Sequence, residues 1–175
     1  MPPEIREKIV HWLKVSIPPE VLEKLVHWLK SSPKRTFILY PLVVFLFELA
    51  IGLGHPSVSP WGAALLLWGY LQYRMVGNYR LEHGGGGPGF SNPPVRLVDD
   101  GPYRFTRNPM YLGHLIFMLG LAITFNSWLG LGILIANTVW FNRRVLEDEI
   151  HMEQQFGADY IAYKAEVKRW IPGLF

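Results

Sequence analysis

The chain has 175 residues, enough for one domain, and half of them are hydrophobic while only 18% are charged. An average soluble domain is about 25% charged, so this composition favours a membrane protein. The net charge of +3 is not arranged as a basic stripe with interleaved aromatics, which argues against nucleic acid as a partner, and the lack of cysteine excludes disulfides, zinc–thiolate sites and thiol nucleophiles. No metal site is predicted.

The N-terminus contains an internal repeat. Residues 2–14 recur sixteen positions later as residues 18–30. Each copy begins with two prolines and an early glutamate, which suit a helix start, and its apolar residues fall on one helical face. The pattern predicts that residues 1–33 form amphipathic helices on the cytosolic membrane surface. They would serve as a membrane anchor or oligomer contact, or else as a lid over the substrate. Without a continuous apolar core, the stretch is not a signal peptide.

Four apolar segments follow, over residues 37–54, 61–76, 110–125 and 128–141. The first is long enough to cross a bilayer, and the others fall slightly short of the ~20 residues a span needs. The 17 lysines and arginines lie before the first segment, from Arg74 near the end of the second segment up to the third, or after the fourth, and the two intervening turns carry none. The positive-inside rule therefore predicts an all-α integral membrane bundle of about four transmembrane helices over residues 34–175. This multi-pass protein would lie in the inner or cytoplasmic membrane, with both termini and the long middle loop in the cytosol.

Details of these segments give further expectations. Short turns predict two antiparallel helical hairpins, with close backbone approach at Gly113, Gly120, Gly130 and Gly132. Glu48, deep in the first segment, either bonds a neighbouring helix, lines a cavity or extends toward the nearby turn. The glycine-rich residues 84–89 lack the lysine and strand of a phosphate-binding loop, so they form either a connector or a mobile loop over a site.

A polar, arginine-bearing segment over residues 101–114 runs directly into the third apolar segment. Asn108 precedes a proline suited to the first helical position, so it is the predicted N-cap, and the first-turn amides would be open to an anionic group. At the end of the fourth apolar segment, Arg144 and Asp148 lie one turn apart on the same helical face. Local chemistry leaves two interpretations: a cofactor pocket on the cytosolic side, or simple capping of helices at the interface.

Four motifs carry a family resemblance, at residues 101–113, 147–149, 156–163 and 169–172. Over roughly the last 80 residues, their order and spacing resemble the isoprenylcysteine carboxyl methyltransferase and phospholipid methyltransferase superfamily, whose members are integral membrane enzymes that use S-adenosylmethionine. The short chain is typical of a prokaryotic member. The resemblance implies a pocket within residues 95–175, and it implies cofactor contacts at Val95, Arg96, Leu97, Val98, Tyr103, Arg107, Asn108, Pro109, Met110, Tyr111, Gly113, Asp148 and Glu149.

The resemblance also implies chemistry. Arg144 matches the arginine with which the carboxyl methyltransferases hold their substrate. Where the eukaryotic enzymes have Arg-His-Pro, this chain has asparagine at position 108, which cannot act as a base near neutral pH. His114 is the nearest histidine, but its place in a membrane helix is more typical of packing. A carboxylate acceptor is favoured because it is already an anion at pH 7 and needs no base.

The sequence therefore predicts S-adenosylmethionine-dependent transfer of a methyl group to a lipophilic acceptor, with formation of a methyl ester. Tyr103 or Tyr111 would offer a ring face to the sulfonium, and a tail helix carrying Tyr160, Tyr163 and Trp170 would close over the pocket. The alternatives are a membrane reductase that uses NADPH, or a non-enzymatic lipid-binding protein. The identity of the acceptor and the oligomeric state stay open.

Overall fold

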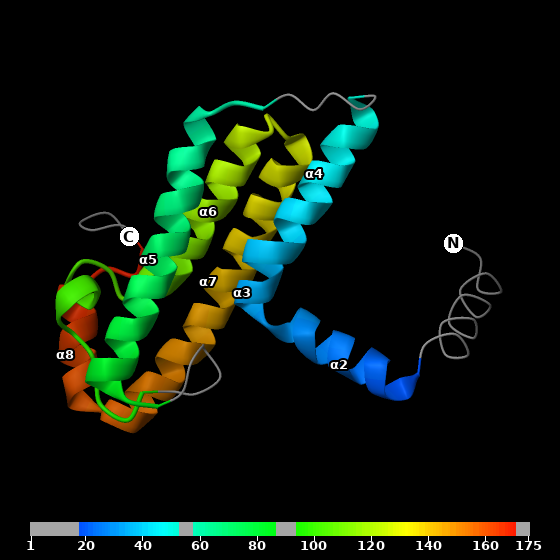
Figure 1. Ribbon diagram of the computed structural model, residues 1–175. Helices are drawn as coiled ribbons and strands as arrows, with labels where there is room; N and C mark the ends of the chain where they lie inside the picture. The colour runs from blue at the N-terminus through cyan, green and yellow to red at the C-terminus, as the bar shows by residue number, and fades with distance from the viewer. Residues whose placement is uncertain (1–17, 53–57, 87–93, 171–175) are drawn as a thin grey trace.

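The computed structural model describes residues 18–52, 58–86 and 94–170, and the regular secondary structure in these ranges is helical, without any strand (Figure 1). The predicted all-α class is confirmed. In chain order the elements are α2 (Pro19–Lys30), α3 (Ser32–Lys34), the π-helical turn η1 (Arg35–Leu39), α4 (Tyr40–Ile51), α5 (Trp61–Gly84), the 3₁₀ turn η2 (Gly101–Arg104), α6 (Pro109–Thr124), α7 (Trp128–Phe156) and α8 (Ala158–Glu166).

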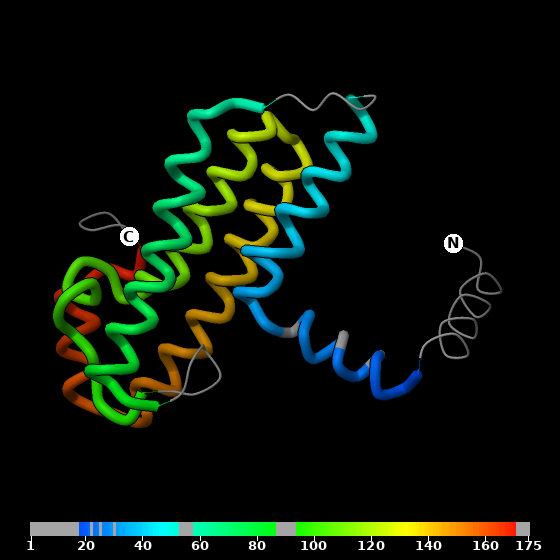
Figure 2. Tube along the Cα trace, in the orientation of Figure 1, coloured from blue at the N-terminus to red at the C-terminus, as the bar shows by residue number. Residues whose placement is uncertain are grey.

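The second copy of the repeat is the helix α2, and the first copy lies outside the described residues. Pro18 occupies the N-cap of α2 and Pro19 its first position, as the paired prolines predict. In Figures 1 and 2, α2 leaves the base of α4 sideways and projects away from the other helices. The valines on its apolar face, Val21 and Val26, are exposed.

Glycines fit α5 closely against α6. A Cβ atom added at Gly69 would lie 2.6 Å from the Gly113 carbonyl oxygen, and one at Gly62 would lie 2.4 Å from that of Gly120. Only glycine lets two backbones approach this closely. The predicted close approach is thus confirmed at Gly113 and Gly120, with α5 as the partner helix. Gly130 likewise packs on Ala122 of α6, whereas the expectation for Gly132 is wrong, because a Cβ atom added there would meet no atom of another described element within 4 Å.

The second predicted hairpin is confirmed, since α6 and α7 pack antiparallel after a tight turn at Asn126 and Ser127. The first is wrong, because α4 packs on α7 rather than on α5 (Figure 2). The glycines of α5 pack against the backbone of α6, so this face of α5 is not open to α4. On α4, the Tyr40 hydroxyl donates a hydrogen bond to Asn137 Oδ1 of α7 at 3.2 Å. Glu48 is buried on α4.

Two clusters form the core. Tyr111, Met118, Phe141 and Val145 pack between α6 and α7, and a second cluster of Tyr160, Tyr163 and Val167 lies beyond the end of the bundle. Within the described ranges, no single helix combines the length and the hydropathy that a membrane crossing requires. Residues of both clusters line one cavity where α7 extends past α6, and the candidate site lies there.

Candidate active site

Three stretches distant in sequence meet at one end of the bundle (Figure 1). The helix α7 has 29 residues and α6 only 16, so the polar second half of α7 extends beyond the other helix. Gly157 ends α7 with a φ of 55°, a conformation that favours glycine, and the chain then turns back into α8. The start of α6, the end of α7 and the chain after α8 therefore face one another.

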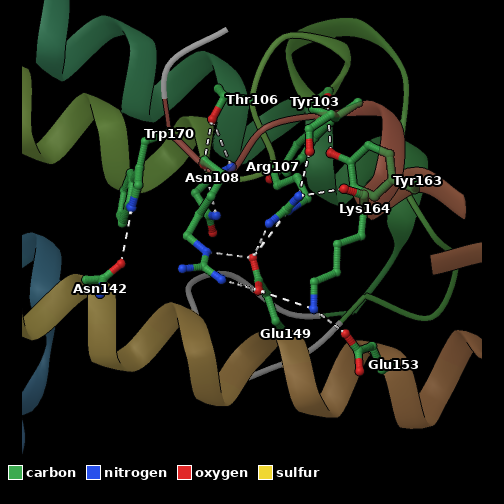
Figure 3. Close-up of polar contacts among 12 residues, drawn as sticks. Tyr103, Thr106, Arg107, Asn108, Asn142, Glu149, Glu153, Tyr163, Lys164 and Trp170 are labelled. Carbon is green, nitrogen blue, oxygen red and sulfur yellow. Dashed lines mark hydrogen bonds and ion pairs between the residues drawn. The ribbon is translucent and has the colours of Figure 1, made fainter. Parts of the chain in front are cut away.

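A buried ion cluster holds these stretches together (Figure 3). Glu149 of α7 accepts hydrogen bonds on Oε1 from Arg107 Nη2 at 2.9 Å and from Arg169 Nε at 3.0 Å, and on Oε2 from Arg169 Nη2 at 2.8 Å. The side chains of Glu149 and Arg107 are only 4% and 8% exposed. Lys164 bonds Glu153 beside this group. Glu149 is therefore the centre of a three-segment junction.

Backbone contacts complete the junction. Arg107 donates from Nη1 to the carbonyls of Lys164 and Val167, and its own amide donates to the Lys168 carbonyl at 3.0 Å. Asn108 lies at the N-cap position of α6, as predicted, but its side chain makes no capping bond. It donates instead to the Arg169 carbonyl at 3.2 Å. The segment 167–170 is thus fixed across the start of α6.

The charge of Glu149 is set by these partners. Burial alone would raise the pKa of its carboxyl, but the hydrogen bonds from Arg169 and Arg107 outweigh burial and lower it. Both carboxylate oxygens are occupied by guanidinium groups. Glu149 is consequently ionised at neutral pH and committed to structure.

The neighbouring acid, Asp148, has a different environment. Its Oδ2 accepts a hydrogen bond from the Tyr111 hydroxyl at 2.9 Å, and its Oδ1 lies 3.3 Å from Arg144 Nε. The side chain is 31% exposed. Burial raises the pKa of Asp148, although Tyr111 and Arg144 act in the opposite direction. Asp148 is the carboxylate that a ligand can reach.

Asp148 faces a cavity of about 510 Å³, within the usual range for small-molecule sites. Nine of the predicted site residues line it: Val98, Tyr103, Arg107, Asn108, Met110, Tyr111, Arg144, Asp148 and Glu149. The tail-helix tyrosines Tyr160 and Tyr163 also line it. Trp170 does not, because its indole packs on the Tyr111 cluster and donates to Asn142 Oδ1 at 3.3 Å.

The other five predicted residues lie outside the cavity. Val95 and Arg96 are exposed, and their amides donate to the Gly84 carbonyl. Leu97 packs on the Tyr160 cluster. The remaining two face α5: the Pro109 carbonyl accepts from Gln72 at 3.0 Å, and Gly113 contacts the backbone of Gly69.

Sequence reasoning missed part of the wall. Pro94 and Arg80 line the cavity, as do Val145, His151, Met152, Gln154 and Gln155 of α7. Most of these α7 residues lie three or four positions, or a multiple of such steps, from Asp148, so the helical period alone could have identified them. Pro94 is placed by its carbonyl, which accepts a hydrogen bond from Gln155 at 2.8 Å. No local pattern in the sequence signals that contact.

Aromatic hydroxyls around the cavity stay protonated. Burial raises the pKa of Tyr103 and of Tyr160 to about 12, and it also raises that of Tyr163. The Tyr163 hydroxyl donates to the Tyr103 carbonyl at 2.7 Å. These side chains therefore offer neutral ring faces rather than phenolate bases.

Comparisons with known proteins agree on one family. The phospholipid methyltransferase family model matches residues 60–159. The chain is 31% identical to the protein-S-isoprenylcysteine O-methyltransferase of Schizosaccharomyces pombe over 78 residues, which is 43% of this chain and 33% of that protein. It is 33% identical to the mouse protein of that name, over 43% of this chain and 27% of the mouse protein. It is 30% identical to Arabidopsis thaliana protein-S-isoprenylcysteine O-methyltransferase A, over 54% of this chain and 43% of that protein. The matched segment thus spans less than half the length of these relatives.

Proposed function

Because the chain belongs to the phospholipid methyltransferase family, we propose that it is a membrane enzyme that transfers a methyl group from S-adenosylmethionine to a lipophilic acceptor. The observation that carries this proposal is the contrast between two adjacent acids. Both carboxylate oxygens of Glu149 are bound by arginines, whereas Asp148 faces a tyrosine-lined cavity. The Asp148 carboxyl is partly exposed and its pKa is raised. Perturbed carboxylates in a cavity are frequent at functional sites.

The cavity residues fit the proposed cofactor. S-adenosylmethionine combines a sulfonium cation, an ammonium, a carboxylate, ribose hydroxyls and an adenine ring. The rings of Tyr103 and Tyr160 suit the cation and the adenine, and Asp148 can accept from hydroxyl or ammonium groups. The first amides of α6, beside Met110, suit a carboxylate. Eight of the thirteen predicted cofactor contacts line the cavity, together with Arg144, the residue predicted to hold the substrate, and this agreement supports the assignment.

When bound, the cofactor supplies an activated methyl group on positively charged sulfur. The task of the chain is then alignment and exclusion of water, which account for much of the rate in a displacement between bound groups. Tyr111 holds Asp148 at a fixed position from one side. Arg144, 39% exposed at the cavity wall, is suited to hold an acceptor carboxylate through two parallel hydrogen bonds.

A second acceptor class is favoured by one specific observation. His151 lines the cavity, and its Nδ1 lies 2.7 Å from the Glu147 carbonyl. A donor at Nδ1 leaves the lone pair of the neutral ring on Nε2, where it can accept a proton. An amine acceptor needs such a base, whereas a carboxylate does not. Methyl-ester formation remains the primary proposal, and amine methylation is the alternative.

Embedding in a membrane is supported by the surface of the bundle. Large apolar side chains are exposed along α4, α5 and α7, among them Leu42, Leu46, Leu67, Trp68, Met75, Ile135 and Val139. A soluble protein rarely exposes apolar surface on this scale. Trp61 and Trp128 are 84% and 83% exposed at the end of the bundle opposite the cavity, where an interfacial aromatic belt would lie. The cavity end, rich in arginine and lysine, would then face the cytosol.

Binding measurements test the cofactor. We expect calorimetric titration of the detergent-solubilised protein to show binding of S-adenosylmethionine and none of NADPH. Asp148→Asn removes the accessible negative charge and should weaken binding at least tenfold, and Glu147→Gln, at the neighbouring 63%-exposed position, is the matched control. Binding of NADPH alone would favour the reductase, and binding of neither would favour a non-enzymatic lipid-binding role.

The acceptor is tested by transfer of label. Methyl-labelled cofactor is incubated with the protein and a total lipid extract, and the product is treated with mild base. A methyl ester releases its label as volatile methanol, whereas a methylated amine retains it. Retained label, together with loss of transfer in His151→Ala, would replace the primary proposal with amine methylation.

A further inference from the structure

A second cavity adjoins the Glu149 junction, in addition to the proposed methyl-transfer site. It is lined by Arg107, Asn142, Lys164, Lys168, Arg169 and Trp170. Four of these six residues are cations. Among the described residues Arg107 alone lines both cavities, so the second one is a separate compartment.

The cations around this cavity are only partly neutralised. Glu149 serves Arg107 and Arg169, and Glu153 serves Lys164, so two carboxylates oppose four positive charges. Lys168 is exposed and forms no ion pair with any described residue. A net positive cavity of this kind attracts an anion.

Hydrogen-bond donors remain available in the same place. Arg169 binds Glu149 through Nε and Nη2, and in the described part of the chain its Nη1 makes no hydrogen bond. The Asn142 carbonyl oxygen accepts from Trp170, which leaves its Nδ2 as a donor. Together with Lys168 Nζ, these groups supply three donors from two elements, a number suited to a phosphate oxyanion.

The position of the cavity indicates where the anion comes from. Asn142 directly follows Phe141, at the boundary between the apolar and polar halves of α7. Trp170 packs its ring on the bundle core and presents its N–H toward Asn142, as tryptophans at membrane interfaces do. If the bundle is embedded as proposed above, this boundary is the level of lipid headgroups.

We propose that this second cavity binds a phosphate group, carried by an anionic phospholipid headgroup or by a free phosphate ion. Arg169 contacts the proposed anion and Glu149 at once, so binding there also stabilises segment 167–170 across the start of α6. The site is independent of the methyl transfer reaction. If no anion binds there, the proposed methyl transfer is unaffected. If the methyl-transfer proposal fails, binding of an anion at this site can still be tested.

Thermal unfolding in an uncharged detergent tests the proposal. The additives are dioleoylphosphatidylglycerol, dioleoylglycerol with the same acyl chains but no phosphate, inorganic phosphate, and sodium chloride at matched ionic strength. At a hundredfold excess over its Kd, a binding ligand raises the Tm of a chain of this size by roughly 5–10 °C. We expect this shift with phosphatidylglycerol and none with dioleoylglycerol or chloride. An equal shift with phosphate identifies the free ion as a ligand, and a shift with the lipid alone identifies the headgroup.

Variants locate the effect. Lys168→Met keeps the apolar stem of an exposed side chain, and combined with Asn142→Ala it should raise the apparent Kd for the phosphate ligand at least tenfold. Arg143→Ala removes an exposed cation adjacent to Asn142 that does not line the cavity, and should leave the Kd unchanged. The proposal is overturned if no phosphate compound shifts Tm beyond chloride, if dioleoylglycerol works equally well, or if Arg143→Ala weakens binding as much as the double variant.

Discussion

The substitution Glu149→Gln tests the junction that builds the candidate site. Glutamine keeps the size of the side chain and one acceptor oxygen, but it removes the negative charge and places an amide donor toward the arginines. Arg107, only 8% exposed, would then lose its counterion. Its bonds to the carbonyls of Lys164 and Val167 would remain. The change therefore measures how much the buried negative charge contributes to the free energy of unfolding.

The expected loss follows from burial. Removal of one partner from a buried ion pair costs about 3–5 kcal/mol, because the other charge stays buried without compensation. Arg107 meets that condition, whereas Arg169 is 26% exposed and partly solvated. Arg169→Gln should accordingly cost less, about 1.5–3 kcal/mol for hydrogen bonds to a charged group. Glu147→Gln, on an exposed side chain, should stay within about 0.5 kcal/mol.

The assay is reversible unfolding in detergent, followed by circular dichroism across a range of pH. The folded pKa of Glu149 is lowered below its ordinary value of 4.5, so its contribution to stability is present above that pH and is lost as pH falls through the folded pKa. Glu149→Gln should remove this dependence below pH 4.5. A cost under 1 kcal/mol at pH 7, or an unchanged acid dependence, would refute the assignment of Glu149 as the centre of the junction.

Four further outcomes follow from the structure. Asp148→Asn should not destabilise the protein at neutral pH. The pKa of Asp148 is raised in the folded state, so its charged carboxylate lowers the stability of the wild type as pH rises through that value. The unfolding midpoint of the variant should therefore exceed that of the wild type at neutral pH, by a difference that shrinks toward acid pH. Gly113→Val should cost about 1–3 kcal/mol in the same assay, because its Cβ would lie 2.9 Å from the backbone of α5. His151→Ala should leave the turnover of a carboxylate acceptor unchanged within twofold, and a hundredfold loss would indicate general base catalysis. The chain has no cysteine, so spin labels on Val21→Cys and Glu23→Cys report α2 alone, from nearly opposite faces of the helix. In lipid nanodiscs, the first should be more accessible to oxygen and the second to a water-soluble nickel complex, and equal values would contradict a surface-bound amphipathic helix.

The parts of the fold that were predictable have a local cause. Helix starts at Pro19 and Pro109 follow from proline at the first turn, and the antiparallel packing of α6 and α7 follows from their short turn. The placement of α4 on α7 was not predictable in this way. It depends on which helix matches the glycines of α5, a property of two surfaces that hydropathy does not encode.

The candidate site divides along the same line. The family resemblance predicted that Tyr111 and Asp148 belong to one site, and the hydrogen bond between them shows that they lie together, on two helices that pack against each other. The sequence left Asp148 and Glu149 as equivalent acids. Their difference comes from Arg169, which lies twenty residues after Glu149 and is brought back only by the turn at Gly157. No periodicity in α7 alone contains that information.

Adjacent residues on a helix project about 100° apart, so two neighbouring acids cannot face the same cavity equally. In α7, Glu149 therefore binds the arginines of the junction, whereas Asp148 is partly exposed at the cavity, where a ligand can reach it. The role of Arg107 changes accordingly: it lines the first cavity, but its hydrogen bonds go to Glu149 and to backbone carbonyls. Arg107→Ala should therefore lower the midpoint of unfolding and weaken cofactor binding together, whereas Asp148→Asn should weaken binding alone. Equal loss of stability in both variants would mean that Asp148 has the same structural role as the ion pair of Arg107 with Glu149, and the proposed binding role of Asp148 would fail.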